Sequence, residues 1–294
     1  MNVHLAYVTP FCPSTGYFPR TTIKADMNYD DFKHIDFDRR PDGVLLATLN
    51  RPEVMNATNA RLHWELSKLW NVINDDASVK VVVVTGAGDR AFSAGGDLEW
   101  IEGMIGDPEV VTAVMKEVAD IVYNMLACEK PIISAINGTA VGAGLAVALL
   151  ADVSVIAEDA TFTDGHARIG VAAGDHAAIV WPLLCGMAKA KYYLMTADFI
   201  NGREAERLGL VTFAVARDEL MERAMAIAAK LARGSQTAIR GTKKALNNWM
   251  HMAGPIFDAS LGIEMLGFLG ADAREGLDAV RNKRAPDFPS ARLP

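Results

Sequence analysis

Two glycine-rich segments of this chain have the composition of loops that present backbone N–H groups to a ligand. In the first, FSAGGDL at 92–98, paired glycines let the backbone approach a ligand closely, which would leave the Gly96 N–H free. In the second, NGTAVGAG at 137–144, the loop leads into an apolar helix that begins near Ala143, and the first N–H groups of a helix lack internal partners. Two such donors that converge would stabilise negative charge on a carbonyl oxygen, although tight packing alone also explains each segment.

A histidine and an aspartate in the segment GHARIGVAAGDH at 165–176 have a spacing that suits proton transfer. His166 and Asp175 are nine residues apart, across a loop whose glycines would let it fold back. The carboxylate would then fix the tautomer of the imidazole, and the other ring nitrogen could take a proton from water. Asp175 also suits the N-cap of the helix that follows, and Asp164 and His176 are alternative partners for the ring.

A dinucleotide-binding turn is the competing interpretation of the first glycine segment. The residues 86–91, GAGDRA, match the pattern GxGxxA after an apolar strand. A dinucleotide-binding turn must open a helix whose N-terminus faces the pyrophosphate. The residues that follow here, FSAGG at 92–96, have low helix propensity. No strand ending in an acidic residue follows about 20 residues on to hold a ribose. We therefore expect no nucleotide cofactor, no redox cofactor and no metal.

Strands and helices alternate in the first two thirds of the chain, and helices fill the rest. The β-branched run at 81–84 suits a strand buried on both faces. We predict further strands at 44–49, 131–136, 153–157 and 161–163. We predict helices at 59–73, 108–126, 143–150, 177–184, 188–196, 203–208, 219–233 and 236–249, with two more pieces within 256–281. This order indicates an α/β core with a C-terminal helical module.

Composition excludes several classes of function. The chain has 294 residues, 51% of them hydrophobic, and 29 basic against 36 acidic residues give a net charge of −7. With no long basic run, we expect no nucleic-acid partner. The apolar segment at 140–151 is too short to span a membrane, and the N-terminus lacks the pattern of a signal peptide. The three cysteines match no zinc spacing and suit reduced thiols, so we expect a cytoplasmic protein.

Three segments occur in the order of a known family's signatures, namely NRPEVMNA at 50–57, AFSAGGD at 91–97 and KPIISAINGTAVGAG at 130–144. The ending EGLDAVRNKRAPDF at 275–288 is similar to the last helix and tail of the same family. Together they resemble the crotonase (enoyl-CoA hydratase/isomerase) superfamily over 31–288, nearly the whole chain.

The resemblance implies a fold and an organisation. The fold would be a crotonase-like spiral of ββα units with a C-terminal helical trimerisation module, and the chain would form a homotrimer or a dimer of trimers. We place an N-terminal tail or arm at 1–30, in which Met27 is an alternative start. The spiral core would occupy 31–200 and the helical module 201–294.

The resemblance also implies an acyl-CoA substrate, with CoA as part of the substrate rather than a resident cofactor. By motif match, the N–H groups of Gly96 and Ala143 would hold the thioester oxygen as an enolate. The matching segments assign substrate-binding positions to Asn56, Ala57, Ala94, Gly95, Asp97, Leu98 and Gly142.

The sequence departs from the hydratases of this family at both catalytic glutamates. One glutamate position is Ala146 here, and the other matches His166. We therefore expect that His166 activates water or transfers a proton in place of paired glutamates. Glu264 lies in a late helix of the kind that can close over the family's active sites, whereas His34, His63 and His251 have no supporting context.

Three hypotheses of function remain open at this point. The first is a hydratase or isomerase that acts on an acyl-CoA thioester. The second is a retro-Claisen hydrolase that cleaves a C–C bond of a β-diketone or cyclic β-ketoacyl-CoA, because the His166–Asp175 pair resembles that of crotonase-like β-diketone hydrolases. The third is a non-catalytic acyl-CoA-binding protein of the same fold, since both usual glutamates are absent.

Overall fold

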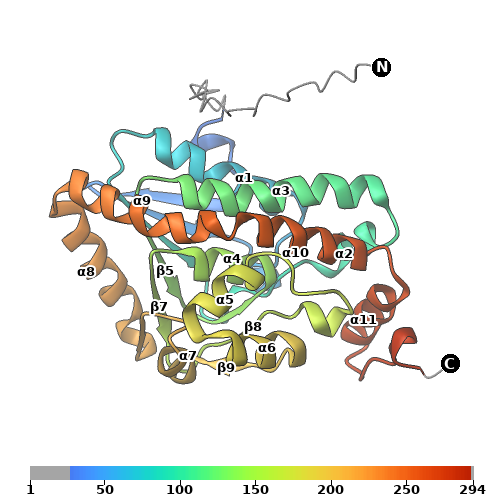
Figure 1. Cartoon of the computed structure of the whole chain (residues 1–294). Helices are drawn as coiled ribbons and strands as arrows, with labels where there is room; N and C mark the ends of the chain where they lie inside the picture. The colour runs from blue at the N-terminus through green and yellow to red at the C-terminus, as the bar shows by residue number, and fades with distance from the viewer. Residues whose placement is uncertain (1–26, 293–294) are drawn as a thin grey trace, which may run out of the picture.

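The computed structural model describes residues 27–292, which form two sheets with helices around them (Figure 1). The first sheet has the order β1-β2-β3-β5-β7-β10. Its β1 and β2 are antiparallel, and its other neighbours are parallel. The strands are β1 Ile35–Arg39, β2 Val44–Leu49, β3 Val81–Gly86, β5 Ile132–Ile136, β7 Val153–Ala157 and β10 Phe213–Val215.

The second sheet is smaller and carries the loops of the candidate site. Its order is β4-β6-β8-β9, where β4, β6 and β8 are parallel and β9 is antiparallel to β8. The strands are β4 Ala91–Ser93, β6 Thr139–Val141, β8 Thr161–Thr163 and β9 Ile200–Asn201.

Three successive ββα units build both sheets at once. The pairs β3–β4, β5–β6 and β7–β8 each give one strand to each sheet and then lead into helical structure. The helices that follow are α2 Leu98–Met104 and α3 Pro108–Ala127, then α4 Gly142–Leu150, then η3 His166–Ile169 and α5 Ala177–Cys185. The expected spiral of ββα units is therefore confirmed.

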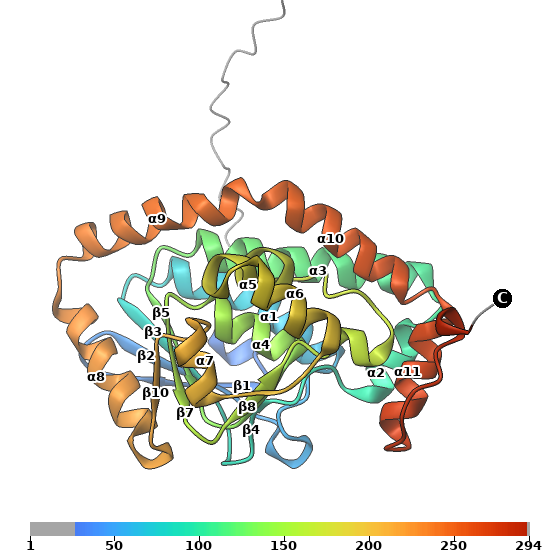
Figure 2. The same cartoon turned by 60° about the horizontal axis from the view of Figure 1, so that its bottom comes forward.

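The remaining helices cover the sheets and end the chain. In Figures 1 and 2, α9 and α10 run as an arc beside α3, while α8 and α11 lie at opposite ends of that arc. The α-helices are α1 Ala60–Asp75, α6 Met187–Thr196, α7 Gly202–Leu208, α8 Leu220–Arg233, α9 Gln236–Met252, α10 Gly254–Gly267 and α11 Ala271–Arg281. Short 3₁₀ turns are η1 Tyr29–Asp31, η2 Pro52–Val54, η4 Arg217–Glu219 and η5 Pro289–Ala291.

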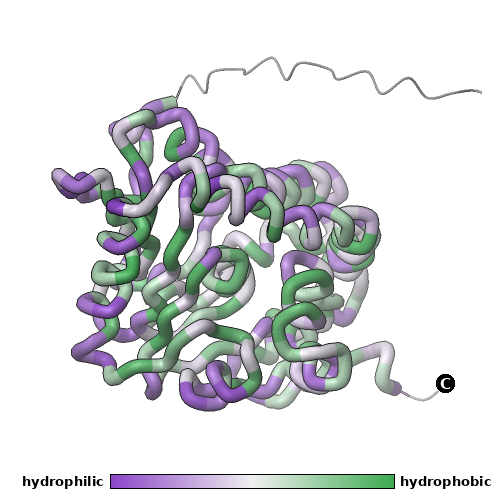
Figure 3. Tube along the Cα trace, turned by 60° about the vertical axis from the view of Figure 1, so that its left-hand side comes forward, coloured by the Kyte–Doolittle hydropathy of each residue, from purple (hydrophilic) through white to green (hydrophobic). Residues whose placement is uncertain are grey.

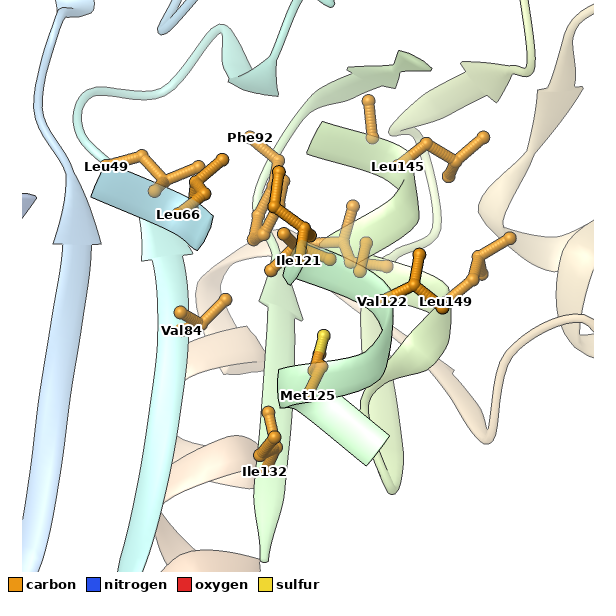
Figure 4. Close-up of a cluster of buried hydrophobic side chains, with 14 of the residues drawn as sticks. Leu49, Leu66, Val84, Phe92, Ile121, Val122, Met125, Ile132, Leu145 and Leu149 are labelled. Atoms are coloured by element: carbon orange, nitrogen blue, oxygen red, sulfur yellow. The ribbon is translucent and has the colours of Figure 1, made fainter. Parts of the chain in front are cut away.

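The core lies between the first sheet and the helices α1, α3 and α4. Figure 4 shows side chains of β2, β3 and β5 that meet Leu66 of α1, Ile121 of α3 and Leu145 of α4. All residues of β3 are buried, as expected for a parallel strand covered on both faces. In Figure 3 the interior strands are mostly hydrophobic and the outer helical turns mostly hydrophilic.

The expected elements agree with the structure to within a few residues where the hydrophobic pattern is long. The short strands β4, β6, β9 and β10, of two or three residues each, were not predicted, and neither was β1. Two or three residues cannot display a period of two, and β10 joins the first sheet from within the helical C-terminal part. The tail at 1–26 lies outside the described residues, and the domain boundaries stay a prediction.

Within residues 27–292, none of the helices combines the length and apolar character that crossing a bilayer requires.

Helix α4 packs against β4 at a contact that only glycine permits. A Cβ added to Gly144 would lie 2.3 Å from Ser93 Cβ, whereas a Cβ added to Gly241 in α9 would meet no atom within 4 Å. The absence of a side chain at Gly144 thus lets the N-terminal turn of α4 sit directly on β4.

We predict opposite effects of the same substitution at these two glycines. Gly144→Ala should lower the free energy of unfolding by about 1–3 kcal/mol, because the new methyl group overpacks the contact with Ser93. Gly241→Ala should raise that free energy by about 0.5–1 kcal/mol, because alanine favours an open helical position. Urea denaturation measures both, and equal effects would contradict the close packing of α4 on β4.

Candidate active site

The parallel strands β4, β6 and β8 end at the same edge of the second sheet, and each is followed by one candidate loop. Gly96 follows β4, Ala143 follows β6 in the first turn of α4, and His166 follows β8 in η3. Because parallel neighbours bring their carboxyl ends together, these residues converge. Gly96, Ala143 and His166 all line one cavity of about 220 Å³.

Two backbone N–H groups at this edge are free to bind an oxygen atom. Within residues 27–292, neither the Gly96 N–H nor the Ala143 N–H donates a hydrogen bond. Gly95 and Gly142, the residues just before them, both have positive φ values, +91° and +51°. A Cβ on Gly142 would lie 3.7 Å from Gly95 Cα, so the two loops are in close contact. This arrangement has the donors of an oxyanion hole.

His166 is held by a carboxylate on each side of its ring. Its Nδ1 donates to Asp164 Oδ1 at 2.9 Å, and its Nε2 lies 3.4 Å from Glu264 Oε1. The Asp164 side chain is fully buried, and the Glu264 side chain is 4% exposed. Glu264 Oε2 accepts from the Gly174 N–H at 3.1 Å, which fixes the carboxylate on α10.

The hydrogen-bonded partner of His166 Nδ1 is Asp164, so the predicted pairing with Asp175 is corrected. Asp175 Oδ1 instead accepts from His176 Nδ1 at 2.8 Å and from the Ala177 N–H at 3.2 Å. It thereby binds the first N–H of α5, but the N-cap residue of that helix is His176, so the alternative expectation of Asp175 as the N-cap is also corrected. Asp175 still lies in the cluster, because one of its oxygens, one from Glu264 and a His166 nitrogen lie within 4.8 Å of one another.

Burial and neighbouring charges shift the pKa values of His166, Glu264 and Asp175. Burial alone would lower the pKa of His166, but Asp164, Glu264 and Asp175 outweigh burial and raise that pKa well above its ordinary value. Burial raises the pKa of Glu264, and positive charge on His166 only partly opposes this. Burial also disfavours charge on Asp175, yet His176 and His166 hold the pKa of Asp175 well below its usual range. The surrounding carboxylates therefore favour the cationic form of the His166 ring.

The same cluster has the ligand types of a metal site. His166, Asp175 and Glu264 offer one nitrogen and two carboxylate oxygens that could surround a cation. The positive charge that the carboxylates favour on His166 offsets part of their negative charge, and the absence of a metal stays a prediction.

The predicted substrate-binding residues divide into two groups. Ala94, Leu98 and Gly142 line the cavity with Gly96 and Ala143. The other four shape the surrounding loops, and they are Asn56, Ala57, Gly95 and Asp97.

Asn56 illustrates this second role. Its buried side chain donates to the carbonyl groups of Ala87 and Ala91, both at 2.9 Å, and accepts from the Arg51 N–H. Arg51 also donates to the Ala57 carbonyl and lies 3.4 Å from Asp97 Oδ2. These bonds fix the loop before α1, so the side chain of Asn56 is not available to a ligand.

Apolar side chains form most of the remaining wall of the cavity. They come from α2, α3, α10 and α11 and from the segment before β9, and they are Trp100, Ile101, Met104, Val114, Val118, Phe199, Met265, Phe268 and Val280. A wall of this kind excludes water and strengthens electrostatic interactions with the polar groups at the cavity edge.

Comparison with known proteins identifies the family and the fold. The family model described as "Enoyl-CoA hydratase/isomerase" matches residues 39–291. The chain belongs to the enoyl-CoA hydratase/isomerase family. It is 33% identical to a crotonyl-CoA hydratase of Syntrophomonas wolfei over 245 residues, which are 82% of this chain and 92% of that protein. It is 32% identical to the 2,3-dehydroadipyl-CoA hydratase of Escherichia coli over 253 residues, 85% of this chain and 96% of that one.

Solved structures of the family have the same fold. An enoyl-CoA hydratase/isomerase from Mycobacterium paratuberculosis matches with a TM-score of 0.80 and 33% identity, covering 84% of this chain and 99% of that chain. A β-diketone hydrolase from the cyanobacterium Anabaena sp. PCC 7120, bound to (S)-3-oxocyclohexyl acetic acid, matches with a TM-score of 0.76 and 27% identity. That match covers 82% of this chain and 96% of the hydrolase.

The sequence was less informative about four positions of this site. Asp164, Glu264 and His63 contribute to its geometry more than the sequence indicated, whereas Ala146 contributes nothing. Ala146 is buried in α4 and does not line the cavity, so no group there replaces the missing glutamate. Asp164 and Glu264, both given little weight, hold the ring of His166. His63, for which the sequence offered no functional context, lines the cavity. The proximity of Asp164 to His166 in sequence was a usable signal, whereas Glu264 and His63 gave none.

The raised pKa of His166 predicts how stability changes with pH. A histidine whose folded pKa is raised contributes stability that is fully present below its unfolded pKa of about 6.5 and is lost as pH rises through the folded pKa. His166→Asn should therefore lower the free energy of unfolding most near about pH 6, and the difference should shrink as pH rises. Urea denaturation across pH measures this, with the exposed His251→Asn as control. A difference that grows with pH would contradict a cationic ring.

Proposed function

We propose that this protein adds water to, or shifts a proton on, an α,β-unsaturated acyl-CoA thioester through an enolate. The observation that carries the proposal is the position of His166 and Glu264, 3.4 Å apart, on the same cavity as the free N–H groups of Gly96 and Ala143. The thioester oxygen would accept both N–H groups, and their stabilisation increases as negative charge develops on that oxygen.

The protonation of the cluster assigns the acid and the base. A cationic His166 cannot accept a proton from water, so of the two roles expected from the sequence, water activation or proton transfer, it suits the second. Glu264, when ionised, takes the proton of water while the hydroxyl oxygen bonds to the β-carbon. The electron pair of the double bond moves onto the thioester oxygen, and the α-carbon then takes a proton from His166 Nε2. This acid and base would replace the paired glutamates of the hydratases.

Retro-Claisen hydrolysis of a cyclic β-diketone is the second candidate. It is favoured by the arrangement of His166, Asp175 and Glu264 around one cavity and by the similarity to the β-diketone hydrolase. Glu264 would take a proton from water as the water oxygen attacks one carbonyl, the C–C bond would break, and the leaving enolate, held by the N–H groups of Gly96 and Ala143, would take a proton at carbon from His166. A binder without catalysis, the third hypothesis, would use the free N–H groups to hold the thioester oxygen but leaves the buried cluster of His166, Asp164 and Glu264 without a use.

The assembly and location belong to the same proposal. Apolar side chains of α9 stand exposed, including Leu246, Trp249 and Met252 at 61%, 65% and 75%. Exposed apolar groups in this number mark a protein interface, which fits a homotrimer or a dimer of trimers in the cytoplasm. Light scattering of the purified protein tests the assembly.

Substrate class is predicted to follow from ligand-induced stabilisation. A short acyl-CoA at about 100 times its dissociation constant should stabilise the native protein by about 2.7 kcal/mol, whereas NAD should not. A thermal-shift titration with acyl-CoA, NAD and a cyclic β-diketone measures this. Stabilisation by the diketone and not by acyl-CoA would overturn the thioester proposal in favour of the hydrolase.

Removal of either proton-transfer group should abolish most turnover. With a substrate confirmed in that titration, His166→Asn and Glu264→Gln should each lower kcat by about 10²–10⁴-fold, because each removes one half of the acid–base pair. The matched control is His251→Asn, which changes an exposed histidine on α9. Rates within about twofold of the unmodified protein for both variants would contradict the assignment, since a catalytic acid or base contributes far more.

A further inference from the structure

His63 is a buried histidine that lines the cavity from a different wall than His166. It lies on α1 and is 1% exposed, and the neighbouring lining residues of α2 and α3 are Trp100, Met104, Val114 and Val118. These neighbours are apolar apart from the indole N–H of Trp100. The mechanism proposed above gives His63 no part.

The orientation of the His63 ring is fixed by two contacts. Nδ1 donates to Glu117 Oε2 on α3 at 2.6 Å. The ring also lies against Trp100, with ring centroids 4.8 Å apart. A carboxylate acceptor requires a proton on Nδ1, so Nε2 is the ring nitrogen left for another partner.

Nε2 of His63 lacks a partner but is not sealed off. Within residues 27–292 it makes no hydrogen bond, and it is absent from the set of polar atoms that are both fully buried and unpaired. The residue lines the cavity, so Nε2 is the ring atom that a bound molecule would meet with its hydrogen-bonding capacity unused. A polar atom desolvated by a purely apolar ligand would cost about 1–3 kcal/mol, so the site selects a ligand that satisfies it.

We propose that the cavity takes an acyl group that carries a hydroxyl, and that His63 Nε2 binds this hydroxyl. With a neutral ring, Nε2 is an acceptor and needs a donor from the ligand; with a cationic ring, Nε2 donates and needs an acceptor. A hydroxyl serves in both cases, whereas a keto or carboxylate oxygen serves only the second. This inference rests on the proposed thioester function, with the thioester oxygen at Gly96 and Ala143.

Paired ligands and paired variants test the inference. We would titrate the protein with saturated hydroxyacyl-CoA thioesters in which the hydroxyl is moved along the chain beyond the β-carbon. The unsubstituted and keto thioesters of the same length serve as comparison ligands, and calorimetry gives each dissociation constant. At one hydroxyl position we expect binding about tenfold tighter than that of the unsubstituted ligand.

The variants assign that preference to the ring nitrogen. His63→Leu and His63→Phe remove Nε2, and the second keeps an aromatic ring beside Trp100, so one remains usable if the other fails to fold. Both should lose the hydroxyl preference, and both should bind the unsubstituted thioester up to about tenfold more tightly than the unmodified protein does, because no ring nitrogen is then left desolvated. His63→Gln, which keeps a polar group, should restore part of the preference, and His251→Leu should leave it unchanged.

Each contrary result has a separate meaning. Binding of all thioesters without a hydroxyl preference, or a preference that persists without His63, overturns the inference and leaves the thioester function standing. Tighter binding of a keto analogue overturns the choice of a hydroxyl. No binding of any thioester overturns the thioester function and this inference with it.

Discussion

The parallel pairing of β4, β6 and β8 is the constraint on which the site depends. These strands have three residues each, yet their shared carboxyl edge places Gly96, Ala143 and His166 on one cavity. The pairing of β4 with β6 is irregular between Ala91 and Ser93, where the register shifts. Such irregularities re-aim the chain beside functional loops, and here the irregular strand leads directly to Gly95 and Gly96.

The long strands of the first sheet make such short strands possible. Each ββα unit first places a buried, β-branched strand, such as β3, in the larger sheet. That strand buries most of the unit's apolar surface. The short strand of the second sheet, with two or three residues, therefore only has to pair with its neighbour. The first sheet therefore supplies most of the buried apolar surface, and the candidate site lies at the edge of the second. Helix α4 packs on the second sheet through the close contact of Gly144 with Ser93.

The sequence predicted what depends on local patterns and missed what depends on contacts between distant segments. The strand 81–84 and the loops around Gly96 and Ala143 were evident because β-branched runs and glycine pairs are local signals. Asp175 was paired with His166 from spacing alone, but its Oδ1 accepts hydrogen bonds from His176 Nδ1 and from the first N–H of α5. Glu264 reaches His166 from α10, and no feature of its own segment indicates that meeting.

The charge balance of the cluster explains why a histidine can stand where the hydratases have a glutamate. Three carboxylates buried together would repel one another, and one cationic ring among them offsets that repulsion. In the proposed mechanism the same ring would supply a proton that a second ionised carboxylate could not, while Glu264, whose pKa burial raises, would exchange one. In that mechanism an enolate formed beside this ring would place negative charge next to positive charge, so the cation that offsets the carboxylates would also favour the proposed intermediate.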